Sequence, residues 1–265
     1  MSLRINSNIE AFNAHRQLAA TSDRASKSME RLSSGYRINR AADDAAGLAI
    51  SEKLRGQING LDQAQRNSQD AVSLVQTAEG SLNEVHSMLQ RVRELAVQYQ
   101  NGTLSTSDKA AITAEAGQLQ SEIDRIGTGA DFNGIKLLDG SGGTISFQVG
   151  ANDGDTIAVK TSALSTEVGT IDVDQTNAIS AIDNAIEKVS ALRGSFGAVQ
   201  NRLEHTLNNL ATYQENLMAS ESRIRDVDMA SEMVQFSKNQ ILQQAGTSML
   251  AQANQAPQAV LTLLR

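Results

Sequence analysis

Few residues of this sequence have the types and the spacing that catalysis or metal binding requires. The three histidines, His15, His86 and His205, lie far apart, and none has an acidic or hydroxyl partner at a motif spacing. No HExxH pattern and no Cys/His pattern is present, so we interpret them as surface or helix-packing residues rather than metal ligands. The chain also has no Cys, which excludes disulfides and a thiol nucleophile.

Two adjacent carboxylates, Asp43 and Asp44, are the remaining candidates for a metal or acid pair. They stand where a long helical pattern begins, with Arg37 and Arg40 just upstream. Because acidic side chains stabilise the positive end of a helix, we predict cap and ion-pair roles for them. The glycines of 127–143 form neither GxGxxG nor GxxxxGK[ST], so no phosphate site is expected. No cofactor is expected anywhere in the chain.

The composition excludes several classes of protein. A net charge of −7 without a basic stripe argues against nucleic-acid binding. The sequence starts without a basic segment followed by an apolar one, so no secretory signal peptide is expected, and no stretch is apolar enough to span a membrane. With no Trp, one Pro and 3% aromatic residues, the composition favours long helices packed on one another.

Heptads of apolar residues are the main structural signal. The seam of a helix over 44–100 is formed by Leu54, Leu61, Ser68, Val75, Leu82, Leu89 and Ala96, with Ala64, Ala71, Ala78, Val85, Val92 and Tyr99 three residues on. A second seam, which begins near 176 with a helix predicted over 176–220, is formed by Ile182, Val189, Phe196, Leu203, Leu210, Leu217 and Ile224, with Ala185, Leu192, Val199, Thr206, Tyr213, Ser220 and Val227 three residues on. Sustained a/d heptads are typical of coiled coils.

Shorter elements complete the pattern. A helix is predicted over 107–126, after an Asn-Gly-Thr triplet at 101–103 that we interpret as a helix-ending turn. Alternating apolar residues around an Asn-Asp-Gly turn predict one β-hairpin within 140–162. Looser amphipathic helices are predicted over 3–35 and 228–255. The expected fold is therefore mainly α: a long antiparallel coiled-coil-like rod with paired termini and a small β-hairpin.

The end of the chain is unusual because residues 239–264 carry no charge, and half of them are apolar. Two thin terminal helices packed on each other would still expose much apolar surface, which usually marks an interaction site.

A second surface is the segment LQRVRELAVQ at 89–98. Its Leu89, Val92 and Ala96 point into the seam. The polar residues that then lie mostly outside it, either as a solvated face or as a lateral contact, are Gln90, Arg91, Arg93, Glu94 and Gln98.

Several long motifs together resemble bacterial flagellin. They occur in the same order as in that family and cover nearly the whole chain: MERLSSGYRINRAADDAAGLAISEKLRGQINGL (29–61), LQRVRELAVQ (89–98), DFNGIKLLDG (131–140), VGANDGD (149–155) and QILQQAGTSMLAQANQAPQAVLTLLR (240–265). The resemblance implies a structural, non-enzymatic subunit of the filament used for swimming. It implies an inner tube domain of 1–43 and 221–265, a shell domain of 44–220, and no outer variable domains.

The resemblance also implies which residues and partners matter. Assembly of the inner domain would use apolar residues of the two termini: Ile5, Ile9, Phe12, Leu32, Met233, Ile241, Leu242, Met249, Leu250, Leu261, Leu263 and Leu264. Small residues such as Ala245, Gly246 and Ala251 would let neighbouring helices approach closely. A lateral contact and an epitope for the Toll-like innate receptor for flagellin would comprise Gln90, Arg91, Glu94, Leu95 and Glu115.

The implied partners are other copies of the chain, a flagellin-specific export chaperone at the C-terminal helices, the filament cap and hook-associated proteins, and the type III export apparatus. The implied location is the extracellular filament, reached without a cleaved signal peptide. Three alternatives stay open at this point: a hook–filament junction protein of the flagellin-like family, a type III needle-like or adhesive filament subunit, and an enzyme.

Overall fold

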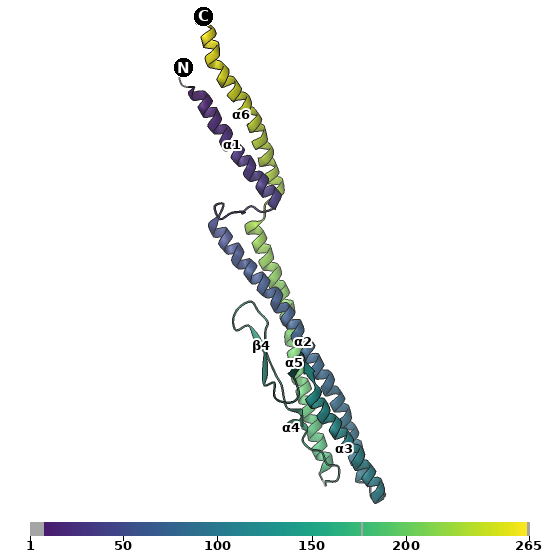
Figure 1. Ribbon diagram of the computed structural model, residues 1–265. Helices are drawn as coiled ribbons and strands as arrows, with labels where there is room; N and C mark the ends of the chain where they lie inside the picture. Colours follow the sequence, from purple (N-terminus) through teal and green to yellow (C-terminus); the bar gives the residue numbers. More distant parts are fainter. Residues whose placement is uncertain (1–7, 176, 264–265) are drawn as a thin grey trace. The chain divides into compact units, whose positions relative to one another are not determined.

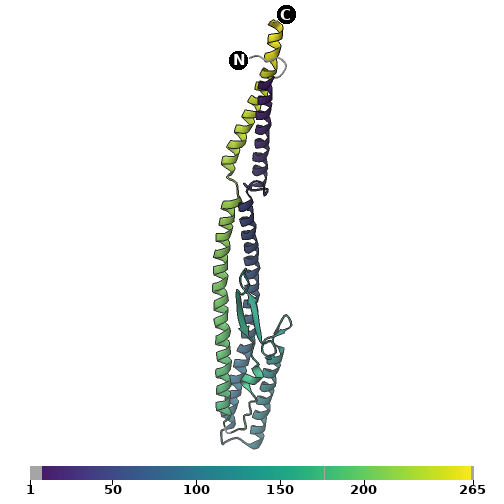
Figure 2. The ribbon, with the colours of Figure 1, turned by 90° about the vertical axis from the view of Figure 1, so that its left-hand side faces the viewer.

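The computed structural model describes residues 8–175 and 177–263, with side chains as far as residue 255. The fold is mainly helical (Figures 1 and 2). Its elements are α1 (Ile9–Ser34), α2 (Ala45–Tyr99), α3 (Thr106–Gly129), β1 (Asp131–Phe132), β2 (Ile135–Lys136), β3 (Thr144–Gln148), β4 (Thr156–Lys160), α4 (Leu164–Val168), α5 (Ala178–Arg225) and α6 (Met229–Leu263). They divide into one unit of residues 1–56 and 217–265 and a second unit of residues 57–216.

The first unit is built on the two terminal helices, α1 and α6, which lie side by side in both views (Figures 1 and 2). They run antiparallel, since the Asn8 amide contacts the Ala253 carbonyl at one end and Arg31 contacts Glu232 at the other. Helix α1 ends at Ser34 and is capped by Gly35, whose positive φ of 75° suits glycine. The paired chain termini agree with the sequence-based expectation.

The second unit is held together by the heptad seam between α2 and α5. Every predicted a and d residue of α2 from Leu61 to Ala96 is buried, and so are Ile182, Val189 and Leu203 of α5. The helices run antiparallel, because Gln65 bonds to Gln214 while Arg93 pairs with Asp183. Tyr213 departs from the predicted seam, since its side chain is exposed.

The β structure is small. Strands β3 and β4 form the expected antiparallel hairpin, in which Phe147 stands opposite Ile157. Hairpin β1–β2 and helix α4 were not anticipated from the sequence. Helix α4 ends at Val168 and α5 begins at Ala178. Helix α6 also continues past Pro257, beyond the expected end of the last helical region at 255.

Of the two aspartates before α2, only Asp44 has the predicted cap role, and neither forms the predicted ion pair within the described residues. Asp44 accepts a hydrogen bond from the N–H of Gly47 at 2.9 Å, which caps α2. Asp43 accepts from the N–H groups of Asn39 and Arg40, and the Arg40 contact is the main reason that the pKa of Asp43 is lowered. The Arg40 guanidinium pairs with a glutamate of α1 instead.

Candidate assembly surface

The interface between α1 and α6 is lined by small residues. The buried positions of α1 are Thr21, Ala25 and Ser28. Across from them, a Cβ placed on Gly246 of α6 would lie only 3.2 Å from Cδ1 of Leu18. Gly246 therefore permits a close approach of α6 to α1 of the same chain, in addition to any role between subunits. Helices that approach through small residues leave their large side chains outside the interface.

Large apolar side chains accordingly face solvent along both terminal helices. Phe12 of α1 is 75% exposed, while Val234 and Ile241 of α6 are 70% and 66% exposed. The other exposed large apolar residues of the two helices are Ile9, Met29, Met229, Met233, Leu242 and Met249. Single exposed apolar residues are normal, but a set that follows two paired helices is the signature of an interaction surface.

The sequence-predicted assembly residues fall into three groups. Those exposed on this surface are Ile9, Phe12, Met233, Ile241, Leu242 and Met249. Leu32 and Leu250 are half-buried. Ile5 and Leu264 lie outside the described residues, as do the side chains of Leu261 and Leu263. Sequence reasoning missed Met29, Met229 and Val234, although Met229 lies one helical turn before Met233.

Helix α6 carries an open apolar groove. Its lining residues follow helical spacing along one stripe: Met233, Val234, Ser237, Lys238, Ile241 and Leu242. Lys238 is the single charge among these six, and its ammonium can stay in water while its stem covers apolar surface. We call this feature the α6 groove. It is too open for a small-molecule cavity and has the form of a docking surface.

A second predicted surface lies on α2 and α3. Arg91 Nη2 is 2.8 Å from Glu115 Oε1 of α3, and Arg91 Nη1 is 3.1 Å from Glu94 Oε2. The hydrogen bond to Glu115, followed by that to Glu94, raises the pKa of Arg91. Gln90 is exposed beside this ion-pair network. The four polar residues therefore form a compact surface patch, which we call the Arg91 patch.

Leu95 requires a correction, because its side chain is not available to a partner. It is 1% exposed and belongs to the apolar core that also contains Ile112 and Ala116 of α3. The heptad pattern describes one interface of α2, whereas α3 covers another face of the same helix. Leu95 therefore does not reach the surface of the Arg91 patch.

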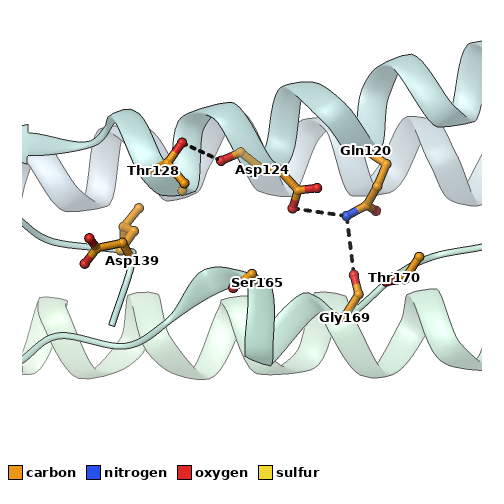
Figure 3. Close-up of a pocket in the computed structure, with 9 residues that line it drawn as sticks. Gln120, Asp124, Thr128, Asp139, Ser165, Gly169 and Thr170 are labelled. Carbon is orange, nitrogen blue, oxygen red and sulfur yellow. Dashed lines mark hydrogen bonds between the residues drawn. The ribbon is translucent and has the colours of Figure 1, made fainter. Parts of the chain in front are cut away.

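A small pocket lies between α3 and α4 (Figure 3). Gln120 Nε2 donates to Asp124 Oδ1 and to the carbonyl of Gly169, which closes one side of the pocket. Ser165 and Thr128 add hydroxyl groups. None of the described lining residues is a His, Lys or Cys, and the Thr128 hydroxyl donates to the backbone carbonyls of Asp124 and Arg125 rather than to a carboxylate.

Other kinds of site find no support in the described part of the chain. Among residues 8–175 and 177–263, no group of three or more His, Cys, Asp or Glu could hold a metal ion. His86 contacts Gln90 of its own helix, while His15 and His205 are exposed. No helix within the described ranges is long and apolar enough to cross a membrane.

Comparisons with known proteins agree on one family. A model described as the bacterial flagellin N-terminal helical region matches residues 5–143, and one described as the C-terminal helical region matches residues 179–264. The flagellin of Halalkalibacterium halodurans is 57% identical over 270 residues, which cover 98% of this chain and 99% of the relative. The flagellin of Bacillus subtilis is 49% identical over 306 residues, covering 99% and 100%.

A solved structure is also similar. The crystal structure of Bacillus cereus flagellin aligns with a TM-score of 0.51 and 36% sequence identity, over 55% of this chain and 88% of that chain. The likeness in sequence therefore spans both terminal regions, including the exposed helices described above.

Proposed function

This chain belongs to the bacterial flagellin family, and from that premise we propose that its paired helices α1 and α6 supply the contacts that build the filament. As a flagellin, the chain is a structural, non-enzymatic protein that polymerises with copies of itself into the extracellular flagellar filament used for swimming. Contacts between copies that do not close into a ring produce such an open helical polymer.

The exposure of large apolar side chains along α1 and α6 is the observation that carries the proposal. Residues 239–264 also lack charge, so packing them inside a tube wall requires no desolvation of an ionised group. Their Gln and Asn side chains keep the capacity to bond to neighbouring subunits or to water. We infer that residues 1–43 and 221–265 form the inner tube and residues 44–220 the surrounding shell.

Electron microscopy of salt-induced polymers tests this assignment. We expect long tubes from the full chain and none from a version that ends at Asn239. The sharper comparison is Ile241→Asp against Ile135→Asp, because both isoleucines are exposed but only Ile241 lies in the α6 groove. Loss of tubes in Ile241→Asp alone supports the proposal. Normal tubes from Ile241→Asp and from the shortened chain would refute it.

We further propose that the same apolar surface is the binding site of an export chaperone before the subunit is exported and assembled. A flagellin-specific export chaperone that covers α6 would keep the exposed side chains of the groove from associating in the cell. The type III export apparatus, the filament cap and the hook-associated proteins would then act on the released chain. Gel filtration of the chaperone with the full chain and with the version ending at Asn239 tests the first step.

We propose that the Arg91 patch is a lateral contact and an epitope for the Toll-like receptor of flagellin. Arg91 and Glu115 are exposed and already pre-organised by their mutual ion pair. A reporter-cell assay of Arg91→Ala/Glu115→Ala should show lost activation. The matched control is Arg93→Ala/Asp183→Ala, which removes another exposed ion pair of α2. Full activity of the first double variant would refute the epitope.

A further inference from the structure

The sulfur chemistry of this chain is carried entirely by methionine. The sequence has seven Met and no Cys. A thiol normally reacts first with mild oxidants. Because this chain has no thiol, the methionine thioethers are the sulfur groups that an oxidant can attack. Where the methionines lie, and how far they are exposed, therefore decides what an oxidant does to this protein.

The exposed methionines include two in the interior of α6. Met233 is 50% exposed and lines the α6 groove, while Met249 is 65% exposed two turns beyond Leu242. Met88 of α2 differs, since it packs against the buried core of the second unit. The accessible sulfurs of α6 thus coincide with the surface for which we proposed an assembly role.

We propose that Met233 and Met249 are sites of reversible oxidation by peroxide, and that oxidation at these sites blocks addition of the subunit to the filament. The inference rests on the proposed function, because it requires the exposed apolar side chains of α6, in the groove and at Met249, to be buried by neighbouring copies. In the reaction, a lone pair of the sulfide attacks one oxygen of hydrogen peroxide. The O–O bond breaks, the sulfur is oxidised by two electrons to the sulfoxide, and the peroxide is reduced to water.

The consequence follows from polarity. A sulfoxide oxygen is a hydrogen-bond acceptor, whereas the thioether that it replaces is flexible and apolar. In the free subunit this oxygen is solvated by water. In the filament it would have to be buried among apolar side chains such as Val234 and Ile241. Burial without a partner is unfavourable, so we expect the free-subunit concentration needed for polymerisation to rise about tenfold or more.

The first experiment compares free and polymerised full-length chain in hydrogen peroxide, with mass spectrometry of the methionine peptides. In the free chain we expect Met233 and Met249 to be oxidised many-fold faster than Met88. In the polymer we expect both to be protected to the level of Met88. Equal oxidation of Met233 and Met249 in the polymer and the free chain would overturn the proposed burial of this face of α6, whatever their reactivity in the free chain.

The second experiment tests the consequence. Oxidised wild-type chain should fail to polymerise at a concentration at which untreated chain polymerises, and treatment with both classes of methionine sulfoxide reductase should restore it. The variant Met233→Leu/Met249→Leu conserves volume, so it should polymerise normally before peroxide and lose much less polymerisation than wild type after it; the exposed Met29 and Met229 of the same surface remain oxidisable. The matched control Met88→Leu should lose polymerisation after peroxide, as wild type does. If the double variant proves as sensitive to peroxide as wild type, these two methionines are not the responsible sites.

Discussion

The side-chain amide of Asn8 donates a hydrogen bond to the carbonyl oxygen of Ala253, with 2.8 Å between nitrogen and oxygen. Ala253 stands four residues before Pro257, so its carbonyl faces the one position in the following turn that has no N–H to donate. The Oδ1 atom of Asn8 meanwhile accepts from the N–H of Ala11 and caps α1. The side chain of Asn8 thereby forms hydrogen bonds with backbone groups of both terminal helices.

This double role predicts different effects for two substitutions of Asn8. Asn8→Asp keeps an oxygen for the Ala11 N–H but cannot donate to Ala253, so it should loosen α6 around Ala253 and leave α1 capped. Asn8→Ala should loosen α6 around Ala253 and also remove the cap of α1. Loss of the cap alone should destabilise α1 by about 1 kcal/mol. Hydrogen exchange of the amides of both helices measures the two effects separately.

A proline substitution supplies the control for this experiment. Pro257→Ala restores an N–H opposite the Ala253 carbonyl, so Asn8→Asp should have little further effect on α6 in that background. An equal effect of Asn8→Asp with and without Pro257 would show that the carbonyl is not what Asn8 stabilises.

Two glycines allow the effect of backbone strain to be separated from that of a steric clash. Gly134 and Gly140 have φ of 79° and 82°, a region unfavourable for any residue with a Cβ. A Cβ on Gly134 would meet nothing within 4 Å, whereas one on Gly140 would lie 2.6 Å from the Cβ of Ala163. Gly134→Ala should cost about 1–2 kcal/mol of unfolding free energy, and Gly140→Ala about 1–3 kcal/mol more.

Urea unfolding of both variants checks this difference, provided that the slope of free energy against urea is unchanged. The additional variant Gly140→Ala/Ala163→Gly should recover part of the loss. Equal midpoints for Gly134→Ala and Gly140→Ala would mean that segment 163–164 moves away without cost.

The interior of the second unit was largely predictable because a heptad repeat records a helix–helix contact directly. Leu89, Val92 and Ala96 are buried as their spacing requires. The repeat could not indicate Leu95, since a period of seven describes contact with one partner helix and α3 covers another face of α2. Hairpin β1–β2 carries the Asn-Gly signal at 133–134, but strands of two residues are too short to show alternation.

The candidate assembly surface was predictable only in part. The lack of charge between Lys238 and Arg265 is visible in the sequence, and it pointed to a buried working state for the tail. Which side of each helix stays open depends on how α1 and α6 pack, and that interface is marked by small residues such as Ala25 and Ser28 rather than by large apolar ones. Met29 therefore fits the apolar spacing of α1 and still faces solvent.

The start of α3 should respond to acid. In its capping box, Ser105 Oγ donates to Asp108 Oδ2 at 2.7 Å, and the Ser105 N–H donates to the same atom at 3.1 Å. These hydrogen bonds, the hydroxyl first, lower the pKa of Asp108. A lowered pKa means that the ionised form favours the folded state, so the stabilisation is complete above about pH 4 and is lost as the pH falls through the folded pKa.

NMR titration of the Asp108 carboxyl in wild type and Ser105→Ala measures this coupling. We expect the pKa of Asp108 to rise toward its ordinary value in the variant. At neutral pH, loss of the Ser105 cap should destabilise the helix by about 1 kcal/mol. An unchanged Asp108 titration would show that the capping box does not persist in solution.

Arg225 should contribute more to the stability of the fold than Arg55, the other arginine that pairs with Glu52. Its guanidinium lies 4.6 Å from the centre of the Tyr36 ring and 2.9 Å from Glu52 Oε1, and its side chain is 15% exposed. Its backbone carbonyl accepts from the N–H of Arg37 at 2.7 Å. Because a lysine can neither stack as a plane nor present a fork, Arg225→Lys should cost about 1 kcal/mol, and Arg225→Ala more.

The local measurement is hydrogen exchange of the Arg37 and Val227 amides. Both donate hydrogen bonds at the crossing of the chain, where residues 35–37 pair with residues 225–227. We expect several-fold faster exchange in Arg225→Lys. The control is Arg55→Ala, which removes an exposed partner of the same glutamate at 3.1 Å and should change exchange little, as surface ion pairs usually contribute under 1 kcal/mol. Equal effects of the two substitutions would mean that charge near Glu52, and not stacking on Tyr36, stabilises the crossing.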